Sequence, residues 1–408
     1  MISPLLHNRM QKFKVPAELK QAGIYPYFRP IEENYDTEVV INGKRVLMFG
    51  SNSYLGLTNH PKVKEAAKKA IDKYGTGCSG SRFLNGTSKL HIELEEKLAD
   101  FTGKEAALVF STGYQTNLGV VASMTGRNDY ILLDEMNHAS IIEGSRLSFS
   151  RAFKYEHNNM HALEHQLRSI NPEAIKLIVV DGIFSMEGDM ADLPTIVELA
   201  KKYHATVMVD DAHSLGVLGK HGEGSAAHFG LTKEVDLIMG TFSKSLASLG
   251  GFIASTADII NYLKHHARSL IFSASIPPSA AGAALAALEI TQNEPERIQN
   301  LWKNMHYMTF SLKSIGFDLG KSATPIIPIF IRNDLATFRI TNRLLKEGVF
   351  VNPVVSPAVP GDSSLLRLSI MATHTKDQMD TAIEKIYKAA REEKVLEMQE
   401  IHSNGRSY

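Results

Sequence analysis

Residues 193–213, LPTIVELAKKYHATVMVDDAH, hold the pattern that decides the fold. The first half, Leu193–Tyr203, places apolar residues at the spacing of an amphipathic helix, whereas Thr206–Val209 is a short apolar run of the kind that forms buried strands. A polar cluster that ends in His213 follows this run directly. A helix that leads into an apolar strand is typical of a parallel sheet covered by helices on both faces.

The same alternation of helix and strand patterns extends over residues 60–255. The amphipathic segments expected to be helices are Pro61–Tyr74, Lys89–Phe101, Asn117–Met124, Leu163–Ser169 and Leu193–Tyr203. The apolar runs expected to be strands are Ala106–Phe110, Tyr130–Leu133, Leu177–Val180, Thr206–Val209, Leu237–Met239 and Phe252–Ala254. This order predicts an α/β fold with a mainly parallel sheet, and it places the ligand site in the loops that follow the strands.

The two ends of the chain have different patterns. Before residue 55 we expect a helical start and a β-hairpin, because Asn42-Gly43 separates two β-prone runs. After Pro277-Pro278 we expect the helices Ser279–Ile290 and Glu296–Ser314, the strands Ile326–Ile331, Val349–Asn352 and Leu366–Ser369, and a last helix from Thr375. We therefore predict three parts: an N-terminal helix and β segment over residues 1–55, a large ligand-binding domain over 56–285 and a small C-terminal domain over 286–408.

The composition is that of an ordinary globular protein with no charge imbalance. Lys and Arg together number 44, as do Asp and Glu, so charge gives no reason to expect a nucleic-acid partner or a membrane surface. The single cysteine, Cys78, cannot form an intrachain disulfide, which favours a reducing cytoplasm. No apolar run approaches the roughly 20 residues of a transmembrane helix, and the first residues lack the pattern of a signal peptide. We expect a soluble cytoplasmic protein.

Three motifs resemble binding sites but occur in the wrong context. Gly75–Gly80 matches the dinucleotide fingerprint and Gly316–Ser322 resembles a P-loop, yet each follows an expected helix rather than a strand. His157, His161 and His165 recur at helical spacing, and we interpret them as a solvated helix face rather than as metal ligands. We expect no metal site, and the lack of a Gly-x-Ser-x-Gly elbow argues against an α/β-hydrolase.

Polar groups gather where three of the expected strands end. Asp210 and His213 follow one strand, and Lys244 follows another among hydroxyl side chains. Ser111–Tyr114 joins a third strand to a helix, so its backbone amides suit an anionic phosphate. Each group alone has an ordinary interpretation, as a polar loop, a surface lysine or a helix N-cap. Their joint occurrence at the strand ends of one sheet indicates a functional site.

These groups match the needs of pyridoxal 5'-phosphate (PLP). PLP requires a lysine amine for its aldehyde and a carboxylate beside its ring nitrogen, which keeps that nitrogen protonated. It also needs a phosphate cup and a ring that stacks on the pyridine face. Lys244, Asp210, Ser111–Tyr114 and His138 can supply these four parts. We therefore expect a PLP enzyme whose cofactor forms a Schiff base with Lys244.

The chain resembles the α-oxoamine synthases, PLP enzymes of fold type I that condense an amino acid with an acyl-CoA and release carbon dioxide. The resemblance extends from Phe49–Leu57 (FGSNSYLGL) to Leu366–Ser369. It implies a large domain with a mainly parallel seven-stranded sheet and a smaller α+β C-terminal domain. The segments Gly240–Ser245 (GTFSKS), Asp181–Asp189 (DGIFSMEGD) and Asn352–Pro360 (NPVVSPAVP) resemble the branch that uses L-serine and palmitoyl-CoA.

In that branch the products are 3-ketodihydrosphingosine, CoA and carbon dioxide, and the reaction is the first step of sphingolipid synthesis. The resemblance implies a homodimer with active sites between the two chains, and at most peripheral contact with the inner membrane surface. The length of the acyl chain, and the choice between acyl-CoA and an acyl-carrier protein as donor, stay open.

Three other functions compete with this interpretation. The nearest is another synthase of the family, of the 2-amino-3-ketobutyrate CoA ligase or 8-amino-7-oxononanoate synthase type, which would use glycine or alanine with a shorter acyl-CoA. A non-catalytic partner subunit is of a different class, and such relatives lack the lysine, whereas Lys244, Asp210 and His213 are all present here. An acyl-lipid-binding module is disfavoured because the sequence shows no hydrophobic anchor.

The resemblance also assigns roles to residues of the expected cofactor site. Lys244 holds the Schiff base and later removes the Cα proton of the amino acid. Asp210 pairs with the ring nitrogen, His213 reaches the ring hydroxyl and His138 stacks on the ring. The residues implied in binding the cofactor phosphate are Gly113, Tyr114, Thr241 and Ser243. Ser273 is implied to reach the cofactor from the partner subunit.

A second set of residues is implied in substrate binding. Arg367 binds the substrate carboxylate, because a planar guanidinium can bind both of its oxygens. Taken without the resemblance, Arg367 would be interpreted as part of a surface ion pair. His138, Asn52 and Ser81 are further candidates for contact with the substrate, whereas Ser185 is expected near the ring as a cofactor-binding residue.

Overall fold

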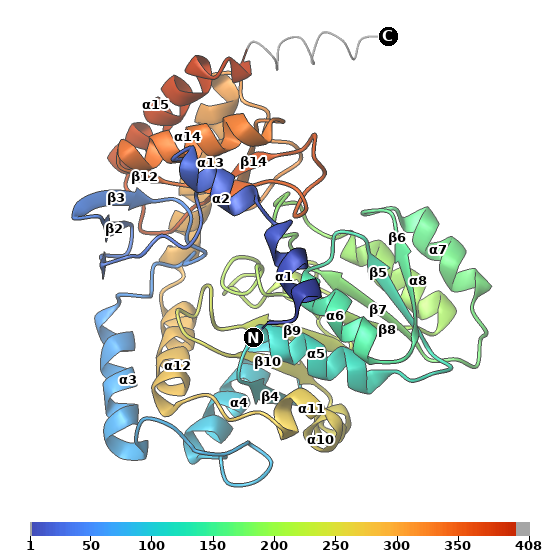
Figure 1. Cartoon of the computed structure of the whole chain (residues 1–408). Helices are drawn as coiled ribbons and strands as arrows, with labels where there is room; N and C mark the ends of the chain where they lie inside the picture. The colour runs from blue at the N-terminus through green and yellow to red at the C-terminus, as the bar shows by residue number, and fades with distance from the viewer. Residues whose placement is uncertain (1, 397–408) are drawn as a thin grey trace.

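A seven-stranded sheet forms the centre of the computed structural model, which describes residues 2–396 (Figure 1). Its strands are β4 (Ala106–Phe110), β5 (Tyr130–Asp134), β6 (Arg151–Tyr155), β7 (Lys176–Asp181), β8 (Thr206–Asp210), β9 (Leu237–Thr241) and β10 (Gly251–Ser255). The order is β4-β10-β9-β8-β7-β5-β6, and only β10 runs antiparallel to its neighbours within this sheet. The predicted mainly parallel sheet of seven strands is confirmed.

One of the seven strands, β6, has no clear signal in the sequence. Its residues are RAFKY, in which charged and apolar residues mix, and three of the five are exposed. β6 lies at the edge of the sheet beside β5. Because an edge strand has a neighbour on one side only and carries charged side chains toward solvent, it needs no continuous apolar run.

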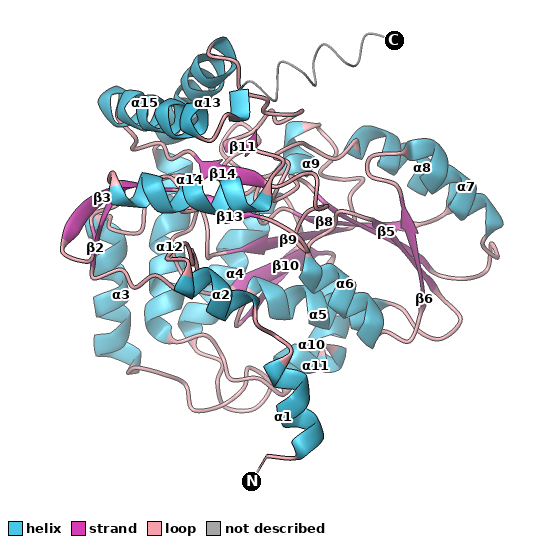
Figure 2. Cartoon of the chain, turned by 45° about the horizontal axis from the view of Figure 1, so that its top comes forward, coloured by secondary structure: helices cyan, strands magenta, loops and turns pink. Residues whose placement is uncertain are grey.

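Helices cover both faces of the large sheet (Figure 2). One face packs against α5 (Gly113–Met124), α6 (Ala139–Leu147), α10 (Ala257–His266) and α11 (Arg268–Ile271), and the other against α4 (Lys89–Thr102), α7 (Met160–Ser169) and α8 (Leu193–Tyr203). Within β5, Ile131 and Leu133 belong to the first core and Leu132 to the second. Successive side chains of a strand point to opposite faces, so two buried faces require the continuous apolar runs seen in the sequence.

Helix α5 begins at Gly113, four residues before the predicted start at Asn117. Thr112 is its N-cap, and its Oγ1 accepts a hydrogen bond from the Gln115 backbone N–H at 3.0 Å. The prediction began too late because the first turn consists of small and polar residues rather than an apolar stripe. As a result, the amino end of α5 lies directly after β4, at the edge of the sheet where the other parallel strands end.

Two smaller sheets join the ends of the chain. One contains β1 (Glu33–Asn34), β2 (Glu38–Ile41), β3 (Lys44–Met48) and β12 (Val349–Phe350), and the other contains β11 (Ile326–Phe330), β14 (Leu365–Ser369) and β13 (Asn352–Val354). The predicted hairpin at Asn42-Gly43 is confirmed. The single strand predicted at Val349–Asn352 is wrong, because the chain passes there from one sheet to the other. The domain boundaries at residues 55 and 285 stay predictions.

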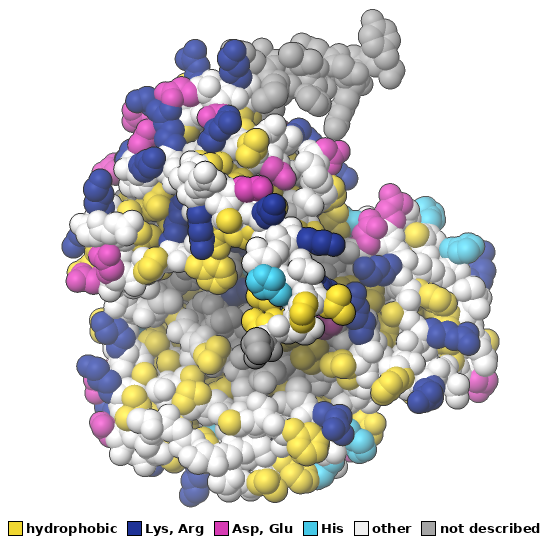
Figure 3. All heavy atoms as spheres, viewed as in Figure 1, with side chains coloured by type: hydrophobic (Ala, Val, Ile, Leu, Met, Phe, Trp, Pro, Cys, Tyr) yellow, Lys and Arg dark blue, Asp and Glu magenta, His cyan; other side chains and the backbone are white. Residues whose placement is uncertain are grey.

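The remaining helices flank these sheets. They are α1 (Pro4–Gln11), α2 (Val15–Gln21), α3 (Pro61–Tyr74), α9 (Ser225–His228), α12 (Pro278–Asn293), α13 (Glu296–Ser314), α14 (Asp334–Lys346) and α15 (Lys376–Glu392). Helix α1 buries none of its side chains, and its Leu5, Leu6 and Met10 are exposed. Basic and acidic side chains are interspersed on the face shown in Figure 3. Across residues 2–396, we find no helix with the length and apolarity that a bilayer crossing requires.

The structure also tests the motifs that we set aside. Gly75–Gly80 follows α3 and Gly316–Ser322 follows α13, so neither has the strand that a nucleotide-binding motif needs. The interpretation of the three histidines as one helix face is wrong for His157, because α7 begins only at Met160. His157 lies in the loop before this helix, between two aspartates.

Candidate active site

The site lies at the edge where the parallel strands end. Asp181 ends β7 and Asp210 ends β8, and the register of the sheet places them opposite one another. Thr241 ends the next strand, β9, three residues before Lys244. Because parallel strands all end at the same edge, groups from distant parts of the sequence converge there.

A cavity of about 250 Å³ opens at this edge, and it brings together most of the predicted cofactor site. Lys244 and Asp210 line the same cavity, as the PLP interpretation requires. The other predicted residues in its lining are Gly113, Tyr114, His138, His213, Thr241 and Ser243. Sequence reasoning missed Asn117, Ser140 and Asp181, which also line it.

The carboxylate of Asp210 is held firmly at one end of this cavity. Its side chain is buried, and the residue is 2% exposed. The Asn117 side-chain amide donates to Asp210 Oδ2 at 2.7 Å, and the Ala212 backbone N–H donates to Oδ1 at 2.9 Å. Asn117 also donates to the Ser140 hydroxyl at 2.8 Å, which lies 2.7 Å from His138 Nδ1. One hydrogen-bonded chain therefore runs from Asp210 to His138.

A second buried carboxyl group, Asp181, supports His138 from the other side. The His138 backbone N–H donates to Asp181 Oδ2 at 2.7 Å. Burial, reinforced by the charge of Asp210, raises the pKa of Asp181 well above its usual range. Burial also lowers the pKa of His138, so its ring is neutral at physiological pH and suited to stacking on an aromatic ligand.

The pKa of the Lys244 amine is lower than that of an ordinary lysine. Burial lowers its pKa to about 8, although the charges of Asp210 and Asp181 act in the opposite direction. A lysine whose pKa lies this close to neutrality has a substantial neutral fraction, and only the neutral amine is a nucleophile or a base. The desolvation that produces this effect comes from the cavity walls themselves.

His213 is fixed by a tyrosine that the sequence analysis did not select. The Tyr54 hydroxyl lies 2.7 Å from His213 Nδ1, which leaves the second ring nitrogen for another partner. Burial lowers the pKa of His213 well below its usual range, with a further contribution from the charge of Lys244. Burial raises the pKa of Tyr54 to about 12, so its hydroxyl stays protonated. Tyr54 lies in the segment after β3, far from His213 in the sequence.

The opposite end of the cavity suits a phosphate. The Gly113 and Tyr114 backbone N–H groups lie in the first turn of α5, where the helix leaves its amides without carbonyl partners. The Thr241 and Ser243 hydroxyls lie 3.0 Å apart beside this turn. Gly251 packs so closely here that a Cβ would lie 2.6 Å from the Gly113 Cα, so only glycine permits this approach.

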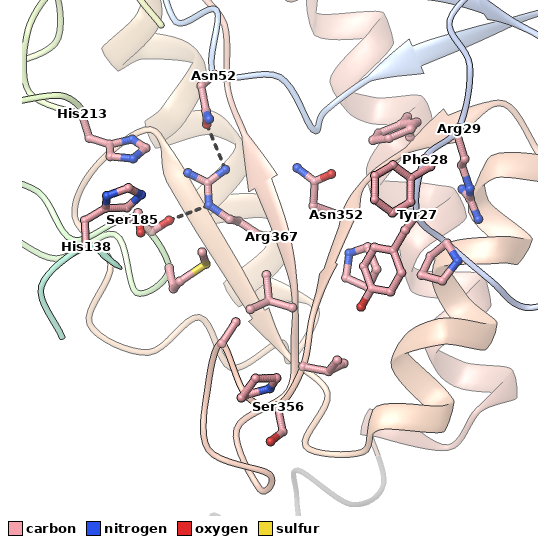
Figure 4. A pocket seen from close by; sticks show the side chains of 18 of the residues that line it. Tyr27, Phe28, Arg29, Asn52, His138, Ser185, His213, Asn352, Ser356 and Arg367 are labelled. Atoms are coloured by element: carbon pink, nitrogen blue, oxygen red, sulfur yellow. Dashed lines mark hydrogen bonds between the residues drawn. The ribbon is translucent and has the colours of Figure 1, made fainter. Parts of the chain in front are cut away.

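A second cavity, of about 610 Å³, opens beside the first and shares His138, His213 and Lys244 with it. Its walls combine residues predicted for substrate or cofactor binding with segments that the sequence analysis did not assign to the site. The predicted residues are Arg367, Asn52 and Ser185, and the new segments are residues 26–29 and 352–358. Figure 4 shows Arg367 between Asn52 and Ser185, with Tyr27, Phe28 and Arg29 on the far side.

Arg367 is held as a buried cation by neutral groups. It is 5% exposed, and its Nε donates to the Ser185 carbonyl at 2.6 Å. Its Nη1 donates to Asn52 Oδ1 at 3.0 Å and to the Ser369 hydroxyl at 2.8 Å. The interpretation as a surface ion pair is therefore wrong. A guanidinium whose partners are neutral keeps its charge for an anionic ligand, and here it faces the cavity that also contains Lys244.

Two predicted residues, Ser81 and Ser273, line neither of these cavities within one chain. Ser81 forms an isolated β-bridge with Ala274, and the Ser273 hydroxyl accepts a hydrogen bond from the Gln115 side-chain amide at 3.1 Å. The two serines therefore lie near one another, in the loop after α3 and the segment before α12. Their roles in binding cofactor and substrate stay predictions.

The residues present fit PLP. A buried carboxylate and a lysine amine share one small cavity, so a ring with a basic nitrogen and an aldehyde could be held from both. The amino end of α5 provides a phosphate site at the same cavity. Asn117 Oδ1 is buried without a hydrogen-bond partner among the described groups, an unsatisfied acceptor beside Asp210 that a bound ligand could reach.

This fold and site define the class of PLP-dependent enzymes with the aminotransferase fold. The family described as "Aminotransferase class I and II" matches residues 44–386, and the chain belongs to this family. A serine palmitoyltransferase of Sphingobacterium spiritivorum is 60% identical over 96% of this chain and 98% of its own length. An 8-amino-7-oxononanoate synthase of Lysinibacillus sphaericus is 45% identical over 92% of this chain and 96% of its own.

The fold has close matches among solved structures as well. Serine palmitoyltransferase from S. paucimobilis with a bound PLP–myriocin aldimine is 35% identical and superposes with a TM-score of 0.92, covering 95% of this chain and 99% of that one. The α-oxoamine synthase resemblance and the PLP cofactor predicted from the sequence are confirmed. The roles of the individual site residues stay predictions.

Proposed function

We propose that this chain condenses L-serine with palmitoyl-CoA, or with a similar long-chain acyl-CoA, and releases CoA and carbon dioxide to form 3-ketodihydrosphingosine. The observation that carries the proposal is that Lys244 and Asp210 share one cavity while Arg367 faces the adjoining cavity, which also reaches Lys244. The similarity to serine palmitoyltransferases over almost the whole chain supports the choice of serine and of a long acyl chain.

Asp210 and the amino end of α5 hold the cofactor in our proposal. PLP, once bound, supplies an electron sink for the negative charge that develops at the Cα of serine. Asp210 holds a proton on the ring nitrogen, because a carboxylate favours the cationic form of a nearby base. The Gly113 and Tyr114 amides, with the hydroxyls of Thr241 and Ser243, bind the phosphate. His138 covers one face of the ring site.

Lys244 serves as the base for the Cα proton. Its amine lines both cavities, so it can reach a substrate that enters from the larger one. A pKa of about 8 gives a neutral amine that can accept the proton near neutral pH and return it later in the cycle. His213 is held neutral by burial and stays a hydrogen-bonding partner rather than a competing acid.

Arg367 binds the carboxylate of serine and thereby orients the Cα bonds. Its fork is braced on one side by the Ser185 carbonyl and on the other by Asn52, so few rotamers remain open to it. The orientation that Arg367 sets would decide which bond at the Cα of serine can break. Holding the carboxylate in this way restrains the geometry at Cα, an effect that can supply several kcal/mol.

The outer part of the larger cavity receives the acyl-CoA in this proposal. Tyr27 and Phe28 on one side, and Met186 and Val354 on the other, give it apolar walls of the kind that an acyl chain requires. Tyr27, Phe28 and Met186 lie in bends or turns and Val354 ends the short strand β13, so none of these walls comes from the large sheet. The acyl chain therefore meets a surface that can adapt to its length.

We propose further that two chains form a homodimer and that the enzyme works in the cytoplasm, with at most peripheral contact with the inner membrane surface. Ser273 and Ser81 lie outside the cavities of their own chain, which supports a role at the site of a second copy. Light scattering coupled to size-exclusion chromatography tests the dimer. A monomer that retains full condensation activity would contradict it.

Product analysis by mass spectrometry tests the function. Purified enzyme with PLP, L-serine and palmitoyl-CoA should yield 3-ketodihydrosphingosine, and serine labelled with ¹³C at its carboxyl should release labelled carbon dioxide. Retention of the label in the product would contradict a decarboxylative condensation. The same reaction without serine is the control.

A second candidate is the 8-amino-7-oxononanoate synthase type of reaction, favoured by the 45% identity to the Lysinibacillus sphaericus enzyme of that name. Assays of serine, glycine and alanine, each against short and long acyl-CoAs, separate the two candidates. Our proposal expects the highest kcat/KM for serine with a long chain. Preference for alanine with a short chain would favour the second candidate.

A further inference from the structure

His157 connects two loops that border the active site. Its Nδ1 lies 2.9 Å from Asp134 Oδ1, and its Nε2 lies 2.8 Å from Asp189 Oδ2. The imidazole is 18% exposed and its ring packs edge-on against Phe184, with 4.4 Å between ring centroids. We call His157, Asp134 and Asp189 the His157 bridge. It follows β6, the strand that the sequence patterns did not reveal.

One end of the bridge holds the loop that carries His138. Asp134 ends β5, and its carboxylate accepts the backbone N–H groups of Met136 and Asn158, each at 2.9 Å. The Asp134 carbonyl also accepts the Asn137 N–H at 3.1 Å. Residues 134–138 are therefore fixed by Asp134, and they end at the histidine that lines both cavities.

The other end of the bridge holds the loop that braces Arg367. Asp189 belongs to the segment between β7 and α8, and its carbonyl accepts the Phe184 N–H at 3.0 Å, which closes a turn around Ser185. The Ser185 carbonyl accepts the Arg367 Nε–H. Asp189 is therefore connected to the guanidinium of Arg367 through the turn of residues 184–189 and the hydrogen bond from Arg367 Nε to the Ser185 carbonyl.

The charges require His157 to be protonated. Both ring nitrogens face carboxylate oxygens, so each must carry a hydrogen to donate. The other acidic groups nearby are Glu187, whose pKa responds to His157, and Glu135, which accepts the His157 backbone N–H at 3.2 Å. Without a cation, the carboxylates of Asp134 and Asp189 would face one another with little water between them, at a cost in free energy.

We propose that the His157 bridge is a positioning device for the reaction, in which an imidazolium fixes the loop of His138 relative to the loop that braces Arg367. Its effect on substrate rests on the proposed function, since it assumes that Arg367 binds the serine carboxylate. The bridge does not touch substrate or cofactor. It acts by holding the ring-facing histidine and the carboxylate-binding arginine at a set separation.

The first test compares His157→Gln with His161→Gln. Glutamine keeps hydrogen bonding at position 157 but removes the charge, and His161 lies exposed on the adjacent helix α7 as a matched control. We expect the KM for serine of H157Q to rise about tenfold, roughly the value of one charge-assisted hydrogen bond. The KM for acyl-CoA should change by less than about twofold. Equal changes in both KM values, or none, would overturn the proposal.

A second readout needs neither cofactor nor activity. Hydrogen exchange in the PLP-free protein should become faster in residues 134–138 and 182–190 of H157Q, and should stay unchanged in the strands β8 and β9. Because this measurement does not depend on the substrate, it separates the two proposals. Faster exchange in a protein that does not use serine would refute the proposed function and leave the bridge standing, whereas unchanged exchange would refute the bridge.

A second substitution should partly restore the serine affinity that H157Q loses. Asp189→Asn in the H157Q background removes one of the two facing carboxylates, so H157Q/D189N should recover part of the serine affinity that H157Q loses. If H157Q does not fold, D189N alone leaves the His157 imidazolium facing one carboxylate, that of Asp134, and loses only the link to the Arg367 loop. We then expect a rise of about threefold in the KM for serine. An unchanged KM in D189N, or no recovery in the double variant, would contradict the bridge.

Discussion

The two cavities that meet at Lys244 are built in different ways. The smaller one is enclosed by strand ends and the first turn of α5, and its central carboxylate, Asp210, is 2% exposed. The larger one is enclosed on its outer side by residues 26–29 and 352–358, which are mostly coil, and Phe28 in its wall is 94% exposed. The rigid cavity suits a cofactor of fixed shape, and the looser one suits a substrate of variable length.

This difference indicates which part of the reaction each region controls. Residues on a sheet are held by packing on both faces, so the covalent chemistry there should tolerate little change. Coil segments have fewer buried contacts, so their substitution should shift preference rather than abolish turnover. Variants in the smaller and in the larger cavity can therefore confirm or refute this difference between the two regions.

The largest effect is expected from Lys244→Ala. The variant should lose the visible absorbance of covalently bound cofactor, and condensation should fall by about 1,000-fold or more, since both the amine nucleophile and the base are removed. The control is Lys233→Ala, which removes an exposed lysine that precedes β9 in the chain. Retention of the absorbance and of activity in K244A would refute the role of the rigid cavity.

Asp210→Asn should have the next largest effect. The amide keeps the size of the side chain but no longer stabilises a proton on the ring nitrogen, so kcat should fall about 100-fold with serine KM changed far less. The apparent affinity for PLP, measured by absorbance titration of the PLP-free protein, should also weaken. A kcat within threefold of the wild type would exclude Asp210 from this role.

Arg367 lies where the two regions meet, and its substitution should affect serine alone. We expect Arg367→Ala to raise the KM for serine about 10- to 100-fold, because a charged contact to the carboxylate is lost, with the cofactor absorbance unchanged. Arg367→Lys, which keeps the charge but not the fork, should lie in between. An unchanged affinity for serine in both variants would contradict the carboxylate-binding role.

Phe28→Ala should have a small and selective effect on activity. Removing an exposed aromatic side chain from the outer wall should change kcat/KM by about two- to fivefold, and the change should depend on acyl-chain length. The KM for serine should stay the same. A uniform loss over chains of different length would show that the outer wall does not contact the acyl chain.

The last expected effect is on stability rather than on activity, and it depends on pH through His157. Burial lowers the pKa of His157, but the hydrogen bonds to Asp134 and Asp189 outweigh it and raise the pKa to about 10. The unfolded chain has its usual value of 6.5, so the charged bridge stabilises the fold fully below pH 6.5, and this contribution declines as pH rises to about 10. The difference in Tm between wild type and H157Q, measured without PLP, should narrow across this range. A constant difference would show that His157 is not charged.

Much of the fold and of the cofactor site could be predicted because the signals are local. Leu193–Tyr203 matched the structure residue for residue, since its apolar stripe lies within the segment itself. Lys244, Asp210 and Ser111–Tyr114 could be placed together because each follows a strand of one parallel sheet. β6 could not be found, because an edge strand carries no apolar run.

The substrate side could be predicted only through the family resemblance. Arg367 alone has the pattern of a surface ion pair, and only the structure shows it buried beside Asn52 and Ser185. Tyr54 and His157 were not assigned to the site at all. Each acts through a partner more than 20 positions away in the sequence, and no local pattern records such a pair.

The sequence by itself determined the order of most strands and helices of the large domain, and with it the edge at which a lysine, a carboxylate and a helix terminus meet. Periodicity and capping are properties of neighbouring residues, so they can be recognised before folding is known. Only the tertiary structure decided which loops close around that edge, which polar groups are buried and therefore shifted in pKa, and that His157 joins two of the loops. Burial and charge pairing depend on contacts between distant segments, and those contacts exist only once the chain has packed.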